Sequence, residues 1–552
     1  MDFYEKLEKE ISKSDDNLSI TENGARGYRS TGRALLDLNF SVPNLRNALE
    51  SRIFEKFKAA FDEDADLALK WLFYVRDVRE GIGERSLFRS IITNIAKTNP
   101  LEICHLIKYI PFYGRWDDLL CLLGIPNVNE IALNIIEKQY ISDLDSLYND
   151  EYNNISLLGK WMPSINTSSR RTRDYAKIII KHLGISEKDY RKSLSLLRDA
   201  INVVEKKMSA NEWDKINYSA VPSRANMIYS NAFLKHDMER RSKYIDDVLS
   251  GKEKINSGTL YPYEIVARLT TIMTNMLLLI GEYPLDEIKS LMAMWNNIPN
   301  LVDPDQKTIV VSDSSGSMYN GYYPSEVRPI DVAVSFAIYF AERLSGEFHD
   351  KFISFGEDPQ IIDLSGCNDL TEKISHVMEY DSIENTDIEK VFNLILDTIV
   401  NNKMKQEDIP NNVLIISDME FDNYRNYYLN KGNTMNKSLF DNIKDDFEKA
   451  GYKIPRLIFW NVGSRTNTIP IIENDMGIAL VSGFSVNAAN MIMSSKLDPY
   501  ECLVEELSVE RYDKIVSIKT KIENIKKDMM EKRWTNCSFL NKTKNHKIEF
   551  RR

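Results

Sequence analysis

Hydrophobic positions in the first 300 residues recur at helical spacing between regularly placed breaks. Within residues 84–99, apolar side chains stand at i, i+1, i+4, i+5 and i+8, from Leu87 to Ile95, and this run stops at Pro100. A second run of the same spacing stops at Pro111. Further prolines interrupt the helical pattern in the same way along the segment. Residues 1–300 are therefore predicted to form paired helices of the HEAT-like repeat type.

After residue 305 the pattern changes to short apolar runs that alternate with amphipathic stretches. The predicted strands are 308–313, 351–356, 359–363, 412–418, 456–462 and 477–483, and the predicted helices are 329–345, 370–379, 387–402, 435–450 and 485–495. This alternation predicts a doubly wound, mostly parallel sheet over residues 305–496. Residues 497–552 are predicted to be a helical tail, with one amphipathic helix over 504–534. The expected fold class is multidomain, α followed by α/β. Residues 14–32 have the composition of a loop or of a segment that becomes ordered on binding.

The composition is that of a globular protein, with 43% hydrophobic and 28% charged residues. No apolar run reaches membrane-spanning length, and the first residues lack the basic-then-apolar order of a secretory signal peptide. The five cysteines are scattered and form no Cys-x-x-Cys pair, so neither a zinc site nor a disulfide framework is expected. We expect an intracellular, cytoplasmic protein in a reducing environment.

Charge is distributed unevenly along the chain. The net charge is −11, yet residues 151–260 contain 20 Lys and Arg against 13 Asp and Glu. Such asymmetry indicates a basic patch that could bind phosphates, although a solvated helical face gives the same pattern. The candidate phosphate-binding residues are Arg170, Arg171, Arg173, Arg191, Lys192, Arg224, Arg240 and Arg241. Trp116, Trp161 and Trp213 are candidates for base stacking, with a core position as the alternative.

Oxygen-bearing side chains follow two of the predicted strands. The segment 312–318 (Ser-Asp-Ser-Ser-Gly-Ser-Met) follows one apolar run, and 417–420 (Ser-Asp-Met-Glu) follows another. Because parallel strands place ligands beyond their carboxyl ends, these segments are expected to meet, together with 385–387. The candidate ligands are Asp313, Ser315, Ser317, Thr386 and Asp418, a hard-oxygen set suited to Mg²⁺ or another divalent cation. The alternative is that the hydroxyls only cap a helix.

This ligand pattern resembles, segment by segment, the metal-ion-dependent adhesion site of von Willebrand factor A domains. In the helical half, residues 74–85 and 110–120 resemble the signatures of Ro/TROVE-like helical modules. Further matching segments are 159–163, 187–192, 221–224, 417–422, 459–462 and 481–485. Together they resemble a domain-of-unknown-function family that joins a Ro-like helical region to an A domain.

The resemblance implies a ring-shaped helical repeat whose ends are clasped by the A domain. It also implies binding of structured small RNAs or of their single-stranded ends, and a metal site whose open position accepts a carboxylate from a protein partner. No role with DNA or a membrane is expected.

Catalytic motifs are missing from the sequence. It contains no Walker A, His-Glu-x-x-His or Gly-x-Ser-x-Gly motif, and the phosphatase-like segment 310–313 lacks the second acid, because Ser315 stands at that position. We therefore expect no enzyme. Two hypotheses remain: an RNA-binding ribonucleoprotein scaffold that docks a partner at the metal site, or a protein–protein adaptor that uses the metal site and binds no RNA.

Overall fold

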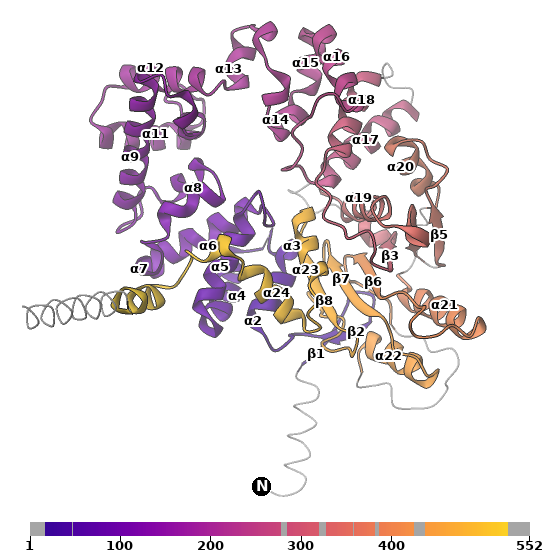
Figure 1. Cartoon of the computed structure of the whole chain (residues 1–552). Coiled ribbons are helices and arrows are strands. Elements are labelled where there is room, and N and C mark those ends of the chain that lie inside the picture. Colours follow the sequence, from indigo (N-terminus) through magenta and orange to yellow (C-terminus); the bar gives the residue numbers. More distant parts are fainter. Residues whose placement is uncertain are drawn as a thin grey trace, which may run out of the picture.

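The chain folds into a helical arc that closes on a sheet domain to make a ring (Figure 1). The computed structural model describes residues 17–46, 48–277, 284–319, 327–356, 358–380, 386–423 and 437–527. A helical region followed by a mostly parallel sheet confirms the expected fold class.

The first part of the arc is built from helices whose apolar faces pack together. Its elements are α4 (Glu50–Glu63), α5 (Ala65–Arg76), α6 (Arg85–Thr98), α7 (Pro100–Ile103), α8 (Ile110–Tyr113) and the 3₁₀ helix η2 (Trp116–Leu122). The five apolar residues of the stripe between Leu87 and Ile95 are at most 5% exposed. Burying each of them stabilises the fold by about 1.5–3 kcal/mol. Asp64 caps α5 by accepting a hydrogen bond from the backbone N–H of Leu67.

The arc continues through two further groups of helices. The first contains α9 (Asn129–Tyr148), α10 (Leu158–Trp161), α11 (Arg170–Leu183) and α12 (Glu187–Ala200); the second contains α13 (Val204–Ser209), α14 (Ser223–Ile228), α15 (Ser230–His236), α16 (Met238–Leu249), α17 (Pro262–Leu277) and α18 (Leu285–Asn296). Ser169 and Ser186 cap α11 and α12. Helices α13 to α16 surround a small apolar cluster of their own, centred on Tyr218 and Phe233 and separate from the main core.

The sheet domain has six strands in the order β5-β4-β3-β6-β7-β8. The strands are β3 (Thr308–Asp313), β4 (Lys351–Phe355), β5 (Gln360–Asp363), β6 (Asn412–Ser417), β7 (Arg456–Asn461) and β8 (Ile478–Ser482). The helices are α19 (Pro329–Ala341), α20 (Leu370–Glu379), α21 (Ile388–Asn401), α22 (Leu439–Lys449) and α23 (Asn490–Met493). All strand pairs are parallel except β4–β5. Every residue of β6, β7 and β8 is buried, as expected for strands covered on both faces.

The N-terminal segment belongs physically with the sheet domain. Strands β1 (Leu18–Ile20) and β2 (Arg26–Tyr28) form a hairpin, so the expectation of a loop over 14–32 is wrong for the described part of that range. Tyr28 forms an isolated bridge with Ile469 and donates its hydroxyl to Asp441 at 2.5 Å. Next come α2 (Ala34–Phe40), which packs on β8, and α3 (Val42–Leu45).

Two junctions close the ring. Helix α17 packs against α19 of the sheet domain, and α24 (Pro499–Leu507) packs against α5. The expected single helix over 504–534 is wrong in its described part, because α24 ends at Leu507 and a new helix begins at Ile518 after a 3₁₀ turn, η9 (Glu510–Tyr512). Residues 528–534 lie outside the described residues. This break lets the segment after α24 lie across the first helices of the arc (Figure 1).

Candidate nucleic-acid interface and metal site

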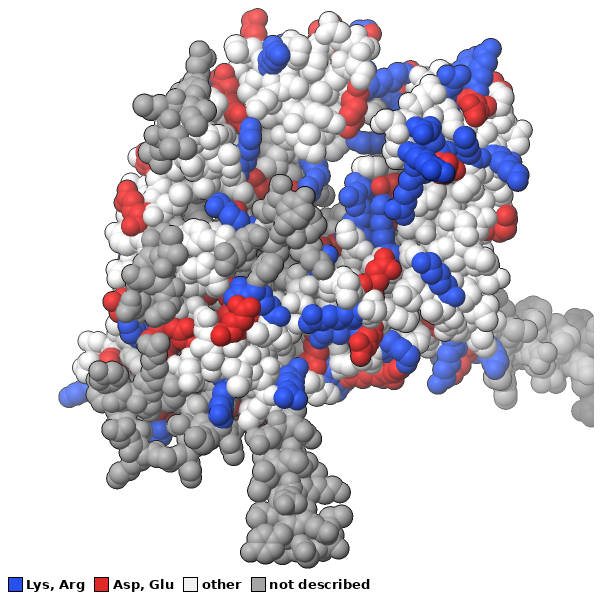
Figure 2. Space-filling model, turned by 180° about the vertical axis from the view of Figure 1, so that it is seen from behind, with Lys and Arg blue, Asp and Glu red and all other residues white. Residues whose placement is uncertain are grey.

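A cavity of about 1160 Å³ lies inside the ring. Its walls come from both halves of the arc and from residues just after β8, so the closed ring creates it. Nine basic side chains line it: Arg46, Arg76, Arg85, Arg115, Lys160, Arg191, Arg198, Lys206 and Arg224. Two acidic residues, Glu84 and Glu205, do so as well. Figure 2 shows Lys and Arg side chains gathered beside the opening of the molecule.

A buried ion pair anchors the basic wall at the first helices. Arg76 and Asp118 lie 2.7 Å apart and both are inaccessible to solvent. Asp118 also binds Arg89 at 2.6 Å and accepts the backbone N–H of Arg115 at 2.9 Å. Burial alone would raise the pKa of Asp118, but the charges of Arg76 and Arg89 lower it below its usual range. The carboxylate is therefore charged at neutral pH and holds three cationic residues around one point.

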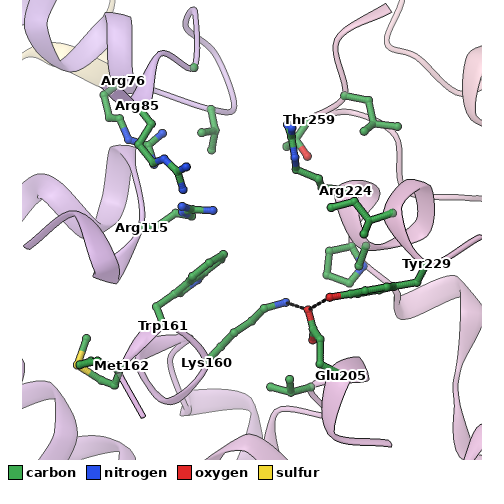
Figure 3. Close-up of a pocket in the computed structure, with 18 of the residues that line it drawn as sticks. Arg76, Arg85, Arg115, Lys160, Trp161, Met162, Glu205, Arg224, Tyr229 and Thr259 are labelled. Carbon is green, nitrogen blue, oxygen red and sulfur yellow. Dashed lines mark hydrogen bonds and ion pairs between the residues drawn. The ribbon is translucent and has the colours of Figure 1, made fainter. Parts of the chain in front are cut away.

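Arg85 and Arg115 bring positive charge to the cavity that this carboxylate does not fully balance. Burial lowers the pKa of both guanidiniums; the charge of Arg89 lowers that of Arg85 further. Within the described part of the chain, Arg85 forms no ion pair. Arg115 pairs with Asp117 at 3.0 Å and lies over the ring of Trp161, 4.0 Å from the centroid. Figure 3 shows these side chains on one wall, directed into the cavity.

The loop that precedes Arg85, the first residue of α6, is held in place by a contact with a distant segment of the chain. Gly83 has φ +82°, a left-handed conformation that glycine adopts without strain. A Cβ atom there would lie 2.6 Å from the Tyr261 hydroxyl, which donates to the carbonyl of Ile82 at 3.0 Å. Gly83 therefore allows residues 82–86 to approach residues 258–261, and both segments line the cavity.

The opposite wall combines one exposed cation with an aromatic ring. Arg224 is 60% exposed at its side chain and pairs with Glu264 at 2.9 Å. Tyr229 donates to Glu205 at 3.4 Å, and Lys160 lies 3.8 Å from the same carboxylate. This link runs across the cavity floor between the two walls (Figure 3).

The structure brings some of the sequence-predicted basic residues to the cavity. Arg191 and Arg224 line it directly, and Lys192 is exposed beside Arg191. Arg170, Arg171 and Arg173 lie in the first turn of α11 and do not line the cavity, although the neighbouring Thr167 and Thr172 do. Arg173 donates to the carbonyl of Thr167 at 2.7 Å.

The predicted phosphate contact at Arg241 is wrong, because this side chain is buried in an aromatic cluster. The side chain of Arg240 is exposed, so a phosphate contact there stays a prediction. Arg241 is fully buried; its guanidinium donates to Asn226 at 3.1 Å and lies against the rings of Tyr218, Phe233 and Tyr244. Arg240 donates to the backbone carbonyls of Trp213 and Ile216. Neither lines the cavity. A phosphate cannot reach Arg241 while its aromatic surroundings are packed.

Sequence reasoning missed seven of the nine cavity cations, namely Arg46, Arg76, Arg85, Arg115, Lys160, Arg198 and Lys206. Four of them lie outside the basic segment 151–260, where local charge gave no signal. Three of these cations, Arg76, Arg85 and Arg115, nevertheless stand in the two segments that resemble Ro/TROVE-like signatures, and this could have identified them. Of the three tryptophans, only Trp161 lines the cavity; Trp213 stacks on His236, 4.4 Å between centroids.

The second candidate site lies at the carboxyl ends of β3 and β6. Ser417 donates to Asp313 at 2.5 Å, and the backbone N–H of Ser315 donates to the same carboxylate at 2.9 Å. The hydroxyls of Ser315 and Ser317 are 3.1 Å apart, and Ser317 bonds to Asp418. Four of the five predicted ligands are thus joined by short contacts.

The fifth ligand, Thr386, lies beside the segment that follows Asp418. Its carbonyl accepts the backbone N–H of Asp422 at 3.1 Å, and its hydroxyl accepts a hydrogen bond from Asn23 at 3.3 Å. Asn23 also donates to the carbonyl of Glu420 at 2.7 Å. Thr386 is therefore held next to residues 420–422 by both backbone and side-chain bonds.

The electrostatics of this site suit a cation. Burial raises the pKa of Asp313 to about 6, and burial together with the charge of Asp313 raises the pKa of Asp418. Two enclosed carboxylates that repel each other, with three hydroxyl groups beside them, fit Mg²⁺ as a donor set. No cluster of three or more His, Cys, Asp or Glu suited to a metal occurs among the described residues, so this candidate site depends on its hydroxyl groups as well as its two carboxylates.

The described helices include none that is both long enough and apolar enough to cross a membrane.

Comparison with known proteins finds two family models that match different parts of the chain. Residues 307–538 match the model of a domain of unknown function, DUF7788, and residues 21–125 and 181–303 match that of another, DUF2828. An uncharacterised protein of Acanthamoeba polyphaga mimivirus is 29% identical over 528 residues, which cover 89% of this chain and 87% of that protein. The crystal structure of the Deinococcus radiodurans Ro (RSR) protein aligns with 82% of this chain, and the alignment covers 92% of the Ro chain. The two sequences are 14% identical, and the TM-score is 0.37.

Proposed function

We propose that this protein is a non-catalytic RNA-binding scaffold that holds single-stranded RNA, or the single-stranded end of a structured RNA, in the cavity of its ring. The observation that carries this proposal is that nine basic and only two acidic side chains line a cavity of about 1160 Å³ inside the ring. The sequence resemblance to Ro/TROVE-like modules points in the same direction.

The chemistry of the cavity fits a single strand. Closely spaced guanidiniums attract phosphates, and their attraction is strongest where other protein charges do not balance them. Trp161 and Tyr229 supply aromatic rings on which unpaired bases stack without a sequence requirement. This local excess of positive charge accounts for RNA binding by a chain whose net charge is −11.

The non-catalytic role rests on the sequence, which contains no Walker A, His-Glu-x-x-His or Gly-x-Ser-x-Gly motif.

We place the protein in the cytoplasm. Its four described cysteines are unpaired thiols, and a reducing compartment keeps cysteines in that state.

We propose a second role for the sheet domain, in which Mg²⁺ held by Asp313, Ser315, Ser317, Thr386 and Asp418 docks a protein partner. A bound Mg²⁺ would offer an open coordination position to a partner carboxylate. This protein's own residues hold the donors in place: Ser417 orients Asp313, and Asp422 and Asn23 orient Thr386.

The RNA proposal is tested by fluorescence anisotropy with a labelled 20-nucleotide single-stranded RNA and the same sequence as a duplex. The double variant Arg85→Glu/Arg115→Glu reverses two cavity charges, and Lys405→Glu is the control, an exposed residue outside the cavity. We expect the wild type to prefer the single strand. The double variant should lose at least tenfold in affinity and the control less than twofold. Equal binding by all three proteins would overturn the proposal.

The alternative is a protein–protein adaptor that binds no RNA, favoured by the buried Asp313–Asp418 pair alone. Protein purified natively at low salt separates the two functions. Absence of co-purifying RNA, together with Mg²⁺-dependent capture of a protein partner, would favour the adaptor. If both roles exist, Asp313→Ala abolishes partner binding and leaves RNA retention intact, because the two sites use different residues.

A further inference from the structure

One cation of the chain itself already binds the metal-site carboxylate Asp418. Arg465, in the segment after β7, places its Nη1 2.9 Å from Oδ2 of Asp418. Its Nε lies 2.6 Å from the carboxylate of Glu22, in the turn of the N-terminal hairpin. The guanidinium therefore bridges two carboxylates that are far apart in the sequence.

The turn between β1 and β2 lies on the same edge of the sheet. The backbone N–H of Glu22 donates to Glu420 at 2.9 Å, and Asn23 donates to the Glu420 carbonyl and to the hydroxyl of Thr386. Gly24 then forms an isolated bridge with Asp422. Residues 22–24 thus contact one predicted metal ligand and the segment that directly follows another.

Arg465 is held in this position by the backbone around it. The buried carboxylate of Glu420 accepts the backbone N–H groups of Arg465, at 2.7 Å, and Thr466, at 2.9 Å. Ser464 adds a hydroxyl bond to the same carboxylate at 3.2 Å. These bonds fix the loop and aim the Arg465 side chain at Asp418, whose side chain is 0% exposed.

We propose that Arg465 and the hairpin turn form an internal plug that occupies the ligand face of the metal site. The inference rests on the proposed metal site and concerns its regulation. Arg465 supplies the positive charge that Asp418 needs when no metal is bound. A divalent cation beside the same carboxylate repels the guanidinium. Metal binding therefore displaces Arg465, breaks its bond to Glu22, and loosens the turn that covers Thr386. A partner carboxylate gains access only after this release.

The mutual exclusion predicts that removal of the plug tightens metal binding. The probe is Mn²⁺, whose free concentration is measured by electron paramagnetic resonance in solutions of the full-length protein. We expect Arg465→Gln to bind Mn²⁺ at least tenfold more tightly than the wild type. Glu22→Gln, which loosens the plug without touching Asp418, is expected to bind several-fold more tightly. The control is Arg343→Gln, which removes a guanidinium that pairs with Glu342 in the same domain; it is expected to match the wild type.

A second readout follows the turn itself. In the wild type, saturating Mn²⁺ is expected to increase hydrogen–deuterium exchange of residues 18–28, and Asp418→Asn should abolish both the binding and this increase. If the wild type binds Mn²⁺ through Asp418 and Arg465→Gln and Glu22→Gln bind no more tightly, the plug is refuted and the metal site stands. If neither the wild type nor Arg465→Gln binds Mn²⁺, or Asp418→Asn retains the binding, the metal site and the plug both fail.

Discussion

Arg511 and Asp77 form an ion pair across 434 positions of sequence, and this pair joins the segment after α24 to the first helices of the arc. The Asp77 side chain is 0% exposed and also accepts the hydroxyl of Tyr512 at 3.2 Å. Tyr512 stacks on Tyr113, with 5.6 Å between ring centroids. The C-terminal segment therefore holds the first helices in place and contributes to the closure of the ring.

Removal of the carboxylate in Asp77→Ala is expected to destabilise this junction by about 3 kcal/mol, because Arg511 and Tyr512 lose their shared buried acceptor and Arg511 keeps only Glu80. Hydrogen–deuterium exchange of residues 499–520 should rise and the midpoint of thermal unfolding should fall. The control is Asp62→Ala, which breaks the exposed Lys58–Asp62 pair and should cost less than about 1 kcal/mol. Equal effects of the two substitutions would show that the Arg511 contact does not hold the junction.

Trp161 and Arg85 are expected to affect RNA binding in different ways. Trp161→Ala removes a stacking surface, so the free energy of binding to single-stranded RNA should become less favourable by about 1–3 kcal/mol. The salt dependence of binding should stay unchanged. Arg85→Ala removes one phosphate contact, so the slope of log K against log salt should become shallower by about 0.7 for a single strand. Anisotropy titrations at four salt concentrations measure both quantities. A steep loss of salt dependence in Trp161→Ala would contradict the assigned roles.

Glu506 makes stability depend on pH. Burial raises the pKa of this carboxyl from 4.5 to about 7, and the charge of Glu80 adds to the rise. The folded state therefore binds the proton more tightly than the unfolded state, and stability falls as pH rises from about 4.5 to about 7. Glu506→Gln should exceed the wild type in stability by about 1–3 kcal/mol at pH 8 and should match it near pH 4.

Urea unfolding at the two pH values measures this difference. Glu239→Gln, an exposed change of the same charge on α16, is expected to show no such pH dependence. A gain in stability of Glu506→Gln that is the same at both pH values would show that protonation of Glu506 is not its cause.

The fold class could be predicted because long amphipathic runs and buried parallel strands leave strong periodic signals. The stripe of α6 and the all-apolar runs of β3 and β6 are examples. The hairpin of residues 18–28 left no such signal, because each strand has three residues and is stabilised by tertiary contacts to Asp441 and Ile469. The break after α24 was missed because isoleucines continue at helical spacing through a segment that bonds instead to Asp66 and Glu102.

The two sites differ in how far the sequence reveals them. Each metal-site segment is short and contiguous, and two of the three follow a strand, so the candidate ligands could be named in advance. Four of the five are joined by short contacts. The cavity is assembled from segments far apart in the chain, and its cations Arg46 and Arg115 stand in stretches with no local excess of positive charge. Only the closed ring brings them together.

The most direct test of RNA binding inside the ring is ultraviolet crosslinking of the full-length protein to single-stranded RNA, followed by mass spectrometry of the nucleotide-bearing peptides. We predict adducts on peptides that contain Trp161 or Tyr229, the aromatic residues of the two cavity walls, and their loss in Arg85→Glu/Arg115→Glu. Adducts confined to peptides outside the cavity, or none at all, would contradict this account.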